Sequence, residues 1–170
     1  KRKGAGTNGV GSTLTNIYST KFKVVTCDGT NQFHQIFSKN LSKRSKPLIT
    51  PKKRKFTEIT YTPELSRFKM ETISDTDREI LFKRCLDVAA CNIKLRISFT
   101  TIKDRKKSTH NIKLKSFSEY ISLHTSDYFY EESEDWKIGF AVSPNGFTNT
   151  SFVNSVHTSN GGTHVEYITN

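Results

Sequence analysis

The sequence has no apolar run close to the roughly 20 residues that a membrane-spanning helix needs. Its N-terminus is basic and polar, without the apolar stretch of a secretory signal, and it begins with lysine, so we expect a fragment or a processed chain. Hydrophobic residues make up 34% of the chain, which is low for a self-sufficient domain and predicts a thin core. We therefore expect no membrane partner and no secretion.

Cysteine is scarce and odd in number, with Cys27, Cys85 and Cys91 as the three in 170 residues. Without a secretory signal, reduced intracellular thiols are expected rather than disulfides. Cys85 and Cys91 lack the spacing of a zinc site, and the five histidines are scattered, so the sequence predicts no metal site.

Acidic residues are missing from the whole interval between Asp28 and Glu58. The chain has 27 Lys and Arg against 16 Asp and Glu, a net charge of +11, and the excess is clustered. Segregated positive charge favours a polyanionic partner, nucleic acid first, with a solvated loop that keeps the chain soluble as the alternative. Residues 51–55, PKKRK, also resemble a nuclear localisation signal. The clusters include Lys52, Lys53, Arg54 and Lys55, and later Arg105, Lys106 and Lys107.

Three glycines recur in the string GTNGVGST, residues 6–13. Glycine permits positive φ and lets an anion approach main-chain N–H groups, and the spacing of Leu14, Ile17 and Tyr18 predicts a short helix directly afterwards. A helix start behind such a turn favours phosphate binding. The string fits neither the dinucleotide fingerprint, which needs a preceding strand, nor a P-loop, which needs a Gly-Lys-Ser/Thr ending. A flexible loop before a helix is the alternative.

The first half of the chain predicts a small antiparallel sheet, with strands at residues 22–27 and 31–37 joined by a turn at Asp28-Gly29. Residues 39–55 hold two prolines and little apolar content, which indicates an exposed loop. A third strand is expected at residues 56–62, with Ile59 and Tyr61 on its buried side, followed by a linker at residues 64–71.

The second half predicts a helix that begins at an N-cap, Ser74, with Asp77 completing a capping box. Its apolar face would carry Leu81, Cys85, Val88 and Ala89, with Cys85 as a core residue rather than a nucleophile. Strands are expected at residues 93–99, 136–142 and 147–157, with a short helix at 117–123. This order of elements indicates an α+β layer.

Several stretches, in one order, resemble type II DNA topoisomerases, nearest the eukaryotic, viral and large-phage branch. They are GTNGVGSTLTNIYSTKF (residues 6–22), PELSRFKM (63–70), SPNGF (143–147), SFVNSVHT (151–158) and GGTHV (161–165). The resemblance implies that residues 1–71 are the C-terminal part of a Bergerat (GHKL) ATP-binding sandwich. Residues 72–170 would then be the first part of a ribosomal S5 domain 2-like transducer.

The family passes one DNA duplex through a transient double-strand break in another, using ATP binding and hydrolysis. The resemblance therefore implies ATP and Mg²⁺ as cofactors and double-stranded DNA as partner, with a homodimer or larger assembly. It places the protein inside the cell, in a nucleus or in the cytoplasm of an infected bacterium. The basic clusters would face DNA. The residues expected to cradle the ATP phosphates, mainly through backbone N–H groups, are Gly6, Thr7, Asn8, Gly9, Val10, Gly11, Ser12 and Thr13.

Thr7, Val10 and Thr13 stand where the common eukaryotic pattern has arginine, tyrosine and lysine, so two cations near the phosphates are absent. The family's general-base glutamate, magnesium-binding asparagine and γ-phosphate lysine have no counterpart in these residues. We therefore assign no catalytic residue and no metal ligand, and we expect these 170 residues alone to be inactive.

Two alternatives stay open. One is another GHKL-superfamily ATPase, of the mismatch-repair or chaperone type, against which the stretch at residues 151–165 speaks. The other is a non-enzymatic, basic nucleic-acid-binding module whose glycine string is incidental.

Overall fold

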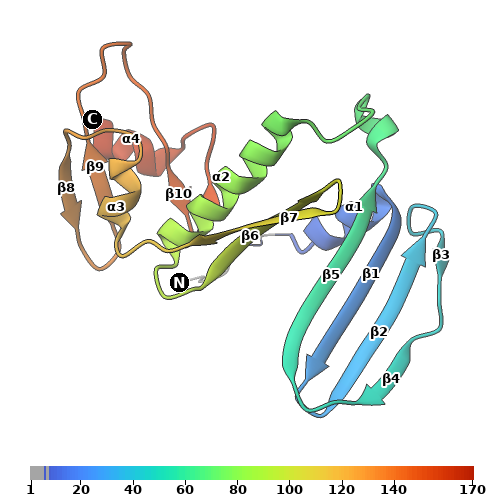
Figure 1. Cartoon of the computed structure of the whole chain (residues 1–170). Helices are drawn as coiled ribbons and strands as arrows, with labels where there is room; N and C mark the ends of the chain where they lie inside the picture. The colour runs from blue at the N-terminus through green and yellow to red at the C-terminus, as the bar shows by residue number, and fades with distance from the viewer. Residues whose placement is uncertain (1–5, 7) are drawn as a thin grey trace. The chain divides into compact units, whose positions relative to one another are not determined.

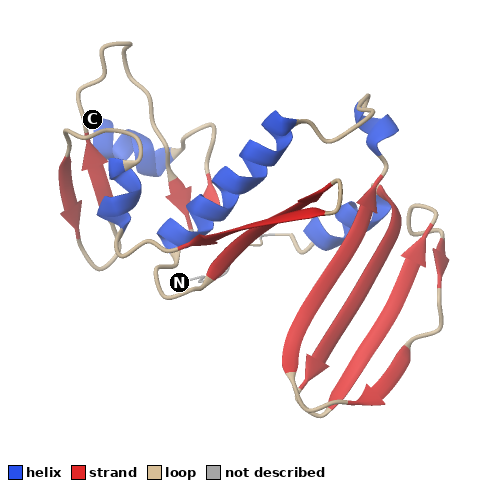
Figure 2. Cartoon of the chain, viewed as in Figure 1, coloured by secondary structure: helices blue, strands red, loops and turns tan. Residues whose placement is uncertain are grey.

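The computed structural model describes residue 6 and residues 8–170. These residues form two compact units, Gly6–Ile73 and Ser74–Asn170 (Figure 1). Each unit combines helices with antiparallel strands, which confirms the expected α+β class (Figure 2). In the described part of the chain, no helix has both the length and the apolar character required to span a bilayer.

The first unit is a sheet with one short helix, α1 (Gly11–Ile17), leading into its central strand. The strands follow the order β3-β2-β1-β5, and β4 also pairs with β2. Phe22 of β1 lies opposite Phe37 of β2 and Tyr61 of β5, with ring centroids 6.4 Å away in both cases. Phe22 is 3% exposed, so it is the buried centre of this aromatic row. The strands are β1 (Ser19–Asp28), β2 (Asn31–Ser38), β3 (Lys43–Arg44), β4 (Leu48–Pro51) and β5 (Lys55–Pro63).

The hairpin between β1 and β2 turns at Asp28-Gly29, as predicted. Gly29 has a φ of 103°, which glycine adopts without steric cost. Asp28 Oδ1 accepts hydrogen bonds from the backbone N–H groups of Asn31 (2.8 Å) and Thr30 (2.7 Å). These bonds stabilise the ionised carboxylate and hold the pKa of Asp28 below its ordinary value.

Two expectations for this unit are wrong. Residues 39–55 are not one loop, because β3 and β4 pair with β2 inside this stretch, and backbone pairing does not require apolar side chains. Ile59 and Tyr61 are 49% and 50% exposed rather than buried. Their strand β5 lies at an edge of the sheet, where a side chain has a neighbouring strand on one side only. The expected linker at 64–71 also contains a short 3-10 helix, η1 (Leu65–Phe68).

The second unit is built around its longest helix, α2 (Asp75–Cys91), and three separate two-stranded sheets. The helix ends at Cys91, with Asn92 as C-cap. The sheets pair β6 (Ile97–Lys103) with β7 (Lys106–Ile112), β8 (Phe129–Glu132) with β9 (Lys137–Phe140), and β10 (Phe152–Val153) with β11 (Val156–His157). Two shorter helices complete it, α3 (Phe117–Ser122) and α4 (Thr163–Thr169).

A buried charge lies at the centre of this unit. Asp87 of α2 is 2% exposed and Tyr120 of α3 is 3% exposed. Asp87 accepts a hydrogen bond from the Tyr120 hydroxyl at 2.7 Å and pairs with Lys83 Nζ at 3.0 Å. Burial, and then the bond to Asp87, raise the pKa of Tyr120, which keeps its hydroxyl a donor. The sequence pattern did not indicate this pair.

Three expectations for the second unit are also wrong. Residues 93–96 form a turn, in which Leu95 N donates to Asn92 O at 2.9 Å, and the strand begins at Ile97. Leu81 is 51% exposed, not part of a buried helix face. Residues 147–157 are not one long strand, because the chain reverses between β10 and β11 at Asn154 and Ser155, which have φ of 50° and 67°.

The side chains of α2 explain that reversal. Arg84 Nη2 donates to Ser155 O at 2.9 Å, and Asn92 Nδ2 donates to Ser155 Oγ at 3.1 Å. Both bonds come from residues far away in the sequence, so no local pattern at residues 147–157 predicts the turn.

The capping box of α2 is confirmed and supports a first prediction. Asp77 N donates to Ser74 Oγ at 3.1 Å, and Ser74 N donates to Asp77 Oδ2 at 2.8 Å. Ser74→Ala is expected to lower the free energy of unfolding by about 1 kcal/mol, because it removes the acceptor for a helix N-terminal N–H. Urea unfolding of both proteins measures the difference.

The loss of stability caused by Ser74→Ala is expected to depend on pH. The hydrogen bonds with Ser74 hold the pKa of Asp77 below its ordinary value of 3.8. A carboxyl group whose pKa is lower in the folded state stabilises the fold above the unfolded pKa, and this contribution is lost as pH falls through the folded pKa. The Ser74→Ala effect should therefore shrink between neutral pH and about pH 2. An effect of the same size at both pH values would contradict the assignment.

Candidate functional site

The glycine string forms an exposed turn that runs directly into α1. Asn8 and Gly9 bend the chain, with Gly9 at a φ of 67°, and Val10 is the N-cap of the helix. No side chain caps this helix end, and its first turn contains no acidic residue. The backbone N–H groups of the first helical turn have no partner within the helix, so they remain available to an external acceptor. Thr7 lies outside the described residues.

The space in front of the glycines is open. A Cβ atom added at Gly6, Gly9 or Gly11 would meet no heavy atom of the described chain within 4 Å. Gly9 needs glycine for its backbone angle, whereas Gly11 has no positive φ and no close neighbour. Among the residues that the structure describes, nothing therefore accounts for glycine at position 11. A group that approaches the backbone from outside would account for it.

The other end of α1 is fixed to the sheet by a hydrogen-bonded cluster. Asn40 Nδ2 donates to Ile17 O at 2.9 Å and to Glu64 Oε2 at 2.8 Å, and Arg67 pairs with the same carboxylate. Arg67 is the main cause of a lowered Glu64 pKa. Through Asn40 and Arg67, the Glu64 carboxylate therefore helps to anchor the end of α1. Asn40 has a φ of 57°, in the left-handed region that asparagine adopts more often than most residues with a side chain.

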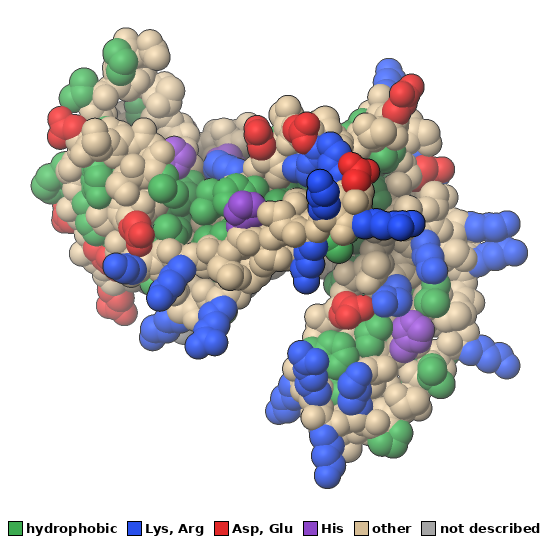
Figure 3. Space-filling model, viewed as in Figure 1, with side chains coloured by type: hydrophobic (Ala, Val, Ile, Leu, Met, Phe, Trp, Pro, Cys, Tyr) green, Lys and Arg blue, Asp and Glu red, His purple; other side chains and the backbone are tan. Residues whose placement is uncertain are grey.

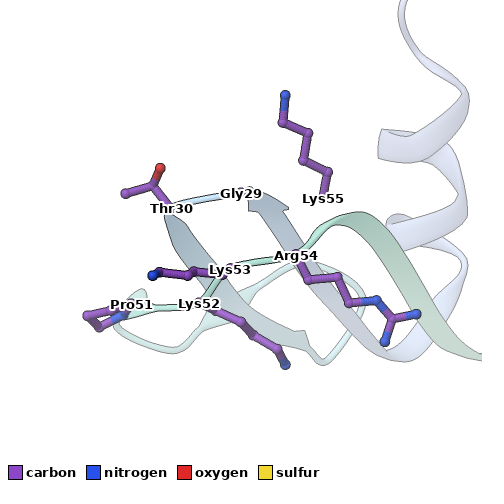
Figure 4. A pocket seen from close by; sticks show the side chains of 7 residues that line it. All are labelled: Gly29, Thr30, Pro51, Lys52, Lys53, Arg54 and Lys55. Carbon is purple, nitrogen blue, oxygen red and sulfur yellow. The ribbon is translucent and has the colours of Figure 1, made fainter.

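The basic residues singled out in the sequence lie in two different units. Lys52, Lys53, Arg54 and Lys55 form the connection between β4 and β5, whereas Arg105, Lys106 and Lys107 lie at the turn between β6 and β7. The first group lines an open hollow of about 700 Å³ together with Gly29, Thr30 and Pro51 (Figure 4). In Figure 3, Lys and Arg side chains gather at the lower end of the first unit, where this connection lies.

Within the first unit, the glycine turn and the basic connection lie at opposite ends of one strand. Helix α1 enters β1 at Ser19, and Asp28 at the other end of β1 pairs with Lys55 (Figure 1). A strand of this length spans about 30 Å. The structure therefore does not bring the two groups into one site.

No group of three or more His, Cys, Asp or Glu side chains suited to a metal ion occurs at residue 6 or among residues 8–170. Burial is the main reason why the pKa of the Cys91 thiol lies above its usual value, which disfavours a reactive thiolate.

No family model matches the chain. Its fold, however, is similar to the crystal structure of the ATPase region of Saccharomyces cerevisiae topoisomerase II, with a TM-score of 0.88 and 31% identity, covering 99% of this chain and 45% of that one. The ATPase and transducer domains of DNA topoisomerase II from Balamuthia mandrillaris give a TM-score of 0.82 and 37% identity, over 96% of this chain and 42% of theirs. The chain is related to the ATPase region of type II DNA topoisomerases.

Sequence comparison gives the same relationship to topoisomerase II. DNA topoisomerase 2 of Arabidopsis thaliana is 33% identical over 99% of this chain, and a probable DNA topoisomerase 2 of Dictyostelium discoideum is 35% identical over 98%. The chain spans 12% and 11% of the length of these relatives. The resemblance noted from the sequence motifs is confirmed, and so is the fold that it implied.

The topoisomerase-like motif at residues 151–165 has a structural role in this chain. Gly161 and Gly162 have φ of 70° and 145°, which side-chain-bearing residues rarely adopt. Thr158 Oγ1 lies 2.6 Å from Ser151 Oγ and 3.1 Å from His164 Nε2, so a chain of hydrogen bonds joins three parts of the motif. The two glycines therefore serve the backbone geometry of this motif, and His164 takes part in its hydrogen bonds.

Proposed function

We propose that this chain is part of the ATP-operated gate of a type II DNA topoisomerase, an enzyme that passes one duplex through a transient break in another. The observation that carries the proposal is the open glycine turn ahead of α1, in a chain related to a topoisomerase ATPase region. Residues 1–71 would belong to the ATP-binding domain and residues 72–170 to the transducer. Residues 1–5 lie outside the described residues.

The turn would hold the ATP phosphates through its backbone. Residues 6–13 carry no charged side chain, so the attraction comes from N–H groups around Gly9, Val10 and Gly11 and from the uncapped helix start. Thr7, Ser12 and Thr13 can add hydroxyl donors. Fixing Ile17 through Asn40 holds the turn in place before a nucleotide arrives.

The chemistry of hydrolysis would come from other parts of the enzyme. The described residues offer no metal cluster, and two glutamates of the first unit form ion pairs, Glu58 with Lys23 at 2.9 Å and Glu64 with Arg67. Bound ATP and Mg²⁺ would supply the phosphoryl group and the charge neutralisation that the reaction needs. This chain would bind and orient the phosphates. DNA, and a second copy of the enzyme, would be its macromolecular partners, within the cell.

A second candidate function has a specific observation in its favour, the strong positive charge of the chain. A non-enzymatic nucleic-acid-binding module would bind DNA tightly, with no dependence on nucleotide or on the glycines. The basic connection at Lys52–Lys55 and the turn at Arg105–Lys107 are the surfaces that would face DNA under either function.

Plasmid relaxation separates the two functions. The full reading frame that encodes this chain is expected to relax supercoiled plasmid with ATP and not without it. Gly9→Val should abolish this activity, because a β-branched residue resists the φ of 67° and projects into the space where the phosphates would lie. Wild-type protein that leaves plasmid topology unchanged would overturn the topoisomerase proposal and favour the binding module.

A further inference from the structure

The positive charge of the described chain is concentrated in one unit. Gly6–Ile73 contains twelve Lys and Arg residues against four Asp and Glu. Ser74–Asn170 contains twelve of each, so it has no net charge despite its own basic turn at Arg105–Lys107. The two basic clusters are therefore not equivalent, and the first unit is the one that attracts a polyanion over a distance.

Within that unit, the basic connection between β4 and β5 is held in place at its first residue, Lys52. We call Lys52, Lys53, Arg54 and Lys55 the basic tip. Lys52 N donates to Thr30 O at 2.8 Å, and the buried Cys27 thiol donates to Lys52 O at 3.2 Å. The Lys52 ammonium donates to Gln32 Oε1 at 2.9 Å and lies 5.3 Å from the Phe56 ring centroid, and Arg54 lies 5.6 Å from the same ring. The tip is thus preorganised, which reduces the entropy lost on binding.

Two carboxylates lie near the basic tip, Asp28 opposite Lys55 in the strand register and Glu58 further along β5. Asp28 directs its Oδ1 to the backbone of its own turn, at 2.7 Å from Thr30 N and 2.8 Å from Asn31 N. The ion pair with Lys23 at 2.9 Å and, to a smaller degree, the charge of Lys52 hold the pKa of Glu58 below its ordinary value, so Glu58 offsets part of the charge of Lys52 only. Lys53, Arg54 and Lys55 are exposed, and no ion pair is found for them among the described residues.

The directions of the side chains indicate the shape of the ligand. Figure 4 shows the side chains of Lys52, Lys53, Arg54 and Lys55 spreading in different directions from the short connection. They do not converge on one point, as ligands of a single phosphate would. Cations spread along an edge suit a row of phosphates, such as the backbone of a nucleic acid.

We propose that the basic tip, with Thr30 beside it, binds the phosphate backbone of duplex DNA without sequence preference, at the end of the sheet opposite the glycine turn. This rests on DNA as a partner in the proposed function, and not on the glycine turn. The rival partner is a receptor for extended basic peptides, as a nuclear import signal would need. Such a receptor binds the backbone of a free segment, whereas the backbone N–H and C=O of Lys52 are already bonded within the unit.

The test compares two variants that each lose two lysines and one arginine. Lys53→Gln/Arg54→Gln/Lys55→Gln alters the basic tip. Lys69→Gln/Lys94→Gln/Arg96→Gln is the matched control, since these three side chains are exposed and lie in neither basic cluster. Anisotropy of a labelled mixed-sequence duplex, titrated with the 170-residue chain over a range of NaCl concentrations, gives affinity and its salt dependence.

The tip variant should reduce the slope of log K against log salt by about 2 to 3, and the affinity at about 0.1 M salt by at least about tenfold, while the control changes the slope by less than about 1. A second variant, Thr30→Glu, places a carboxylate in the hollow without removing a cation and should also weaken binding. It leaves the Thr30 backbone bonds in place.

Three results would overturn the proposal: equal slopes for the tip and control variants, no salt-dependent duplex binding by the wild type, or lost binding to a basic-peptide receptor with DNA binding intact. The proposed function fails separately. ATP-dependent relaxation that survives Gly9→Val would refute the phosphate-binding turn and leave the basic tip standing. Equal slopes alongside normal relaxation would refute the tip alone.

Discussion

Gly11→Val is expected to reduce ATP affinity at least about 100-fold, or roughly 2.7 kcal/mol, while leaving the thermal stability of the protein nearly unchanged. A substitution at position 11 can change ligand binding without disturbing the fold. An added Cβ meets no heavy atom of the described chain within 4 Å, and the backbone angle is ordinary. The valine would fill the space next to the backbone N–H groups that we propose as phosphate donors. Calorimetry of ATP binding by the full reading frame, with a parallel melting curve, measures both quantities.

Two controls sharpen this result. Ser12→Ala and Thr13→Ala remove side-chain hydroxyls and keep every backbone N–H, so both should bind ATP within a few-fold of the wild type if backbone donors dominate. A loss at Ser12 or Thr13 as large as that at Gly11 would refute backbone binding. A Gly11→Val protein that binds ATP normally would refute the location of the site.

The largest stability effect is expected from Asp87→Ala. The substitution leaves the Tyr120 hydroxyl without its acceptor at 2.7 Å and Lys83 without its carboxylate at 3.0 Å, in the interior of the second unit. Breaking one side of such a pair costs about 3 kcal/mol, at the lower end of the usual range because Lys83 is partly exposed. Urea unfolding followed by circular dichroism measures the loss.

A matched acid on the same helix provides the control. Asp75 pairs with Arg78, but its side chain is 83% exposed, so Asp75→Ala should cost less than about 1 kcal/mol. Tyr120→Phe, which removes the hydroxyl alone, should fall between the two, at about 1 to 2 kcal/mol. If Asp87→Ala and Asp75→Ala destabilise equally, the buried pair is not what holds α2 to α3.

Sequence reasoning succeeded where the cause of a structure is local. The Asp28-Gly29 turn depends on one glycine and one carboxylate that bonds the N–H groups two and three residues ahead. The capping box at Ser74 likewise needs two residues three apart. The bend at Asn8 and Gly9 belongs to the same class, since a φ of 67° is open to glycine without steric cost.

It failed where distant residues decide. The reversal at Ser155 depends on Arg84, 71 positions earlier, and the anchoring of α1 depends on Asn40 and Glu64, 24 positions apart. A single sequence has no pattern that pairs such residues. The basic clusters show an intermediate case: their positions were evident, but their assignment to one strongly charged unit and one neutral unit needed the fold.

The two edges of the first sheet differ in how well they resist pairing with an additional strand. On one side lie β3 and β4, which are short and carry lysine, arginine and proline, features that discourage another strand from adding. On the other side β5 runs from Lys55 to Pro63, and within the described residues it is hydrogen-bonded to β1 alone. Strand addition, whether by a native segment or by aggregation, is therefore directed to β5, where Ile59 and Tyr61 are already half exposed.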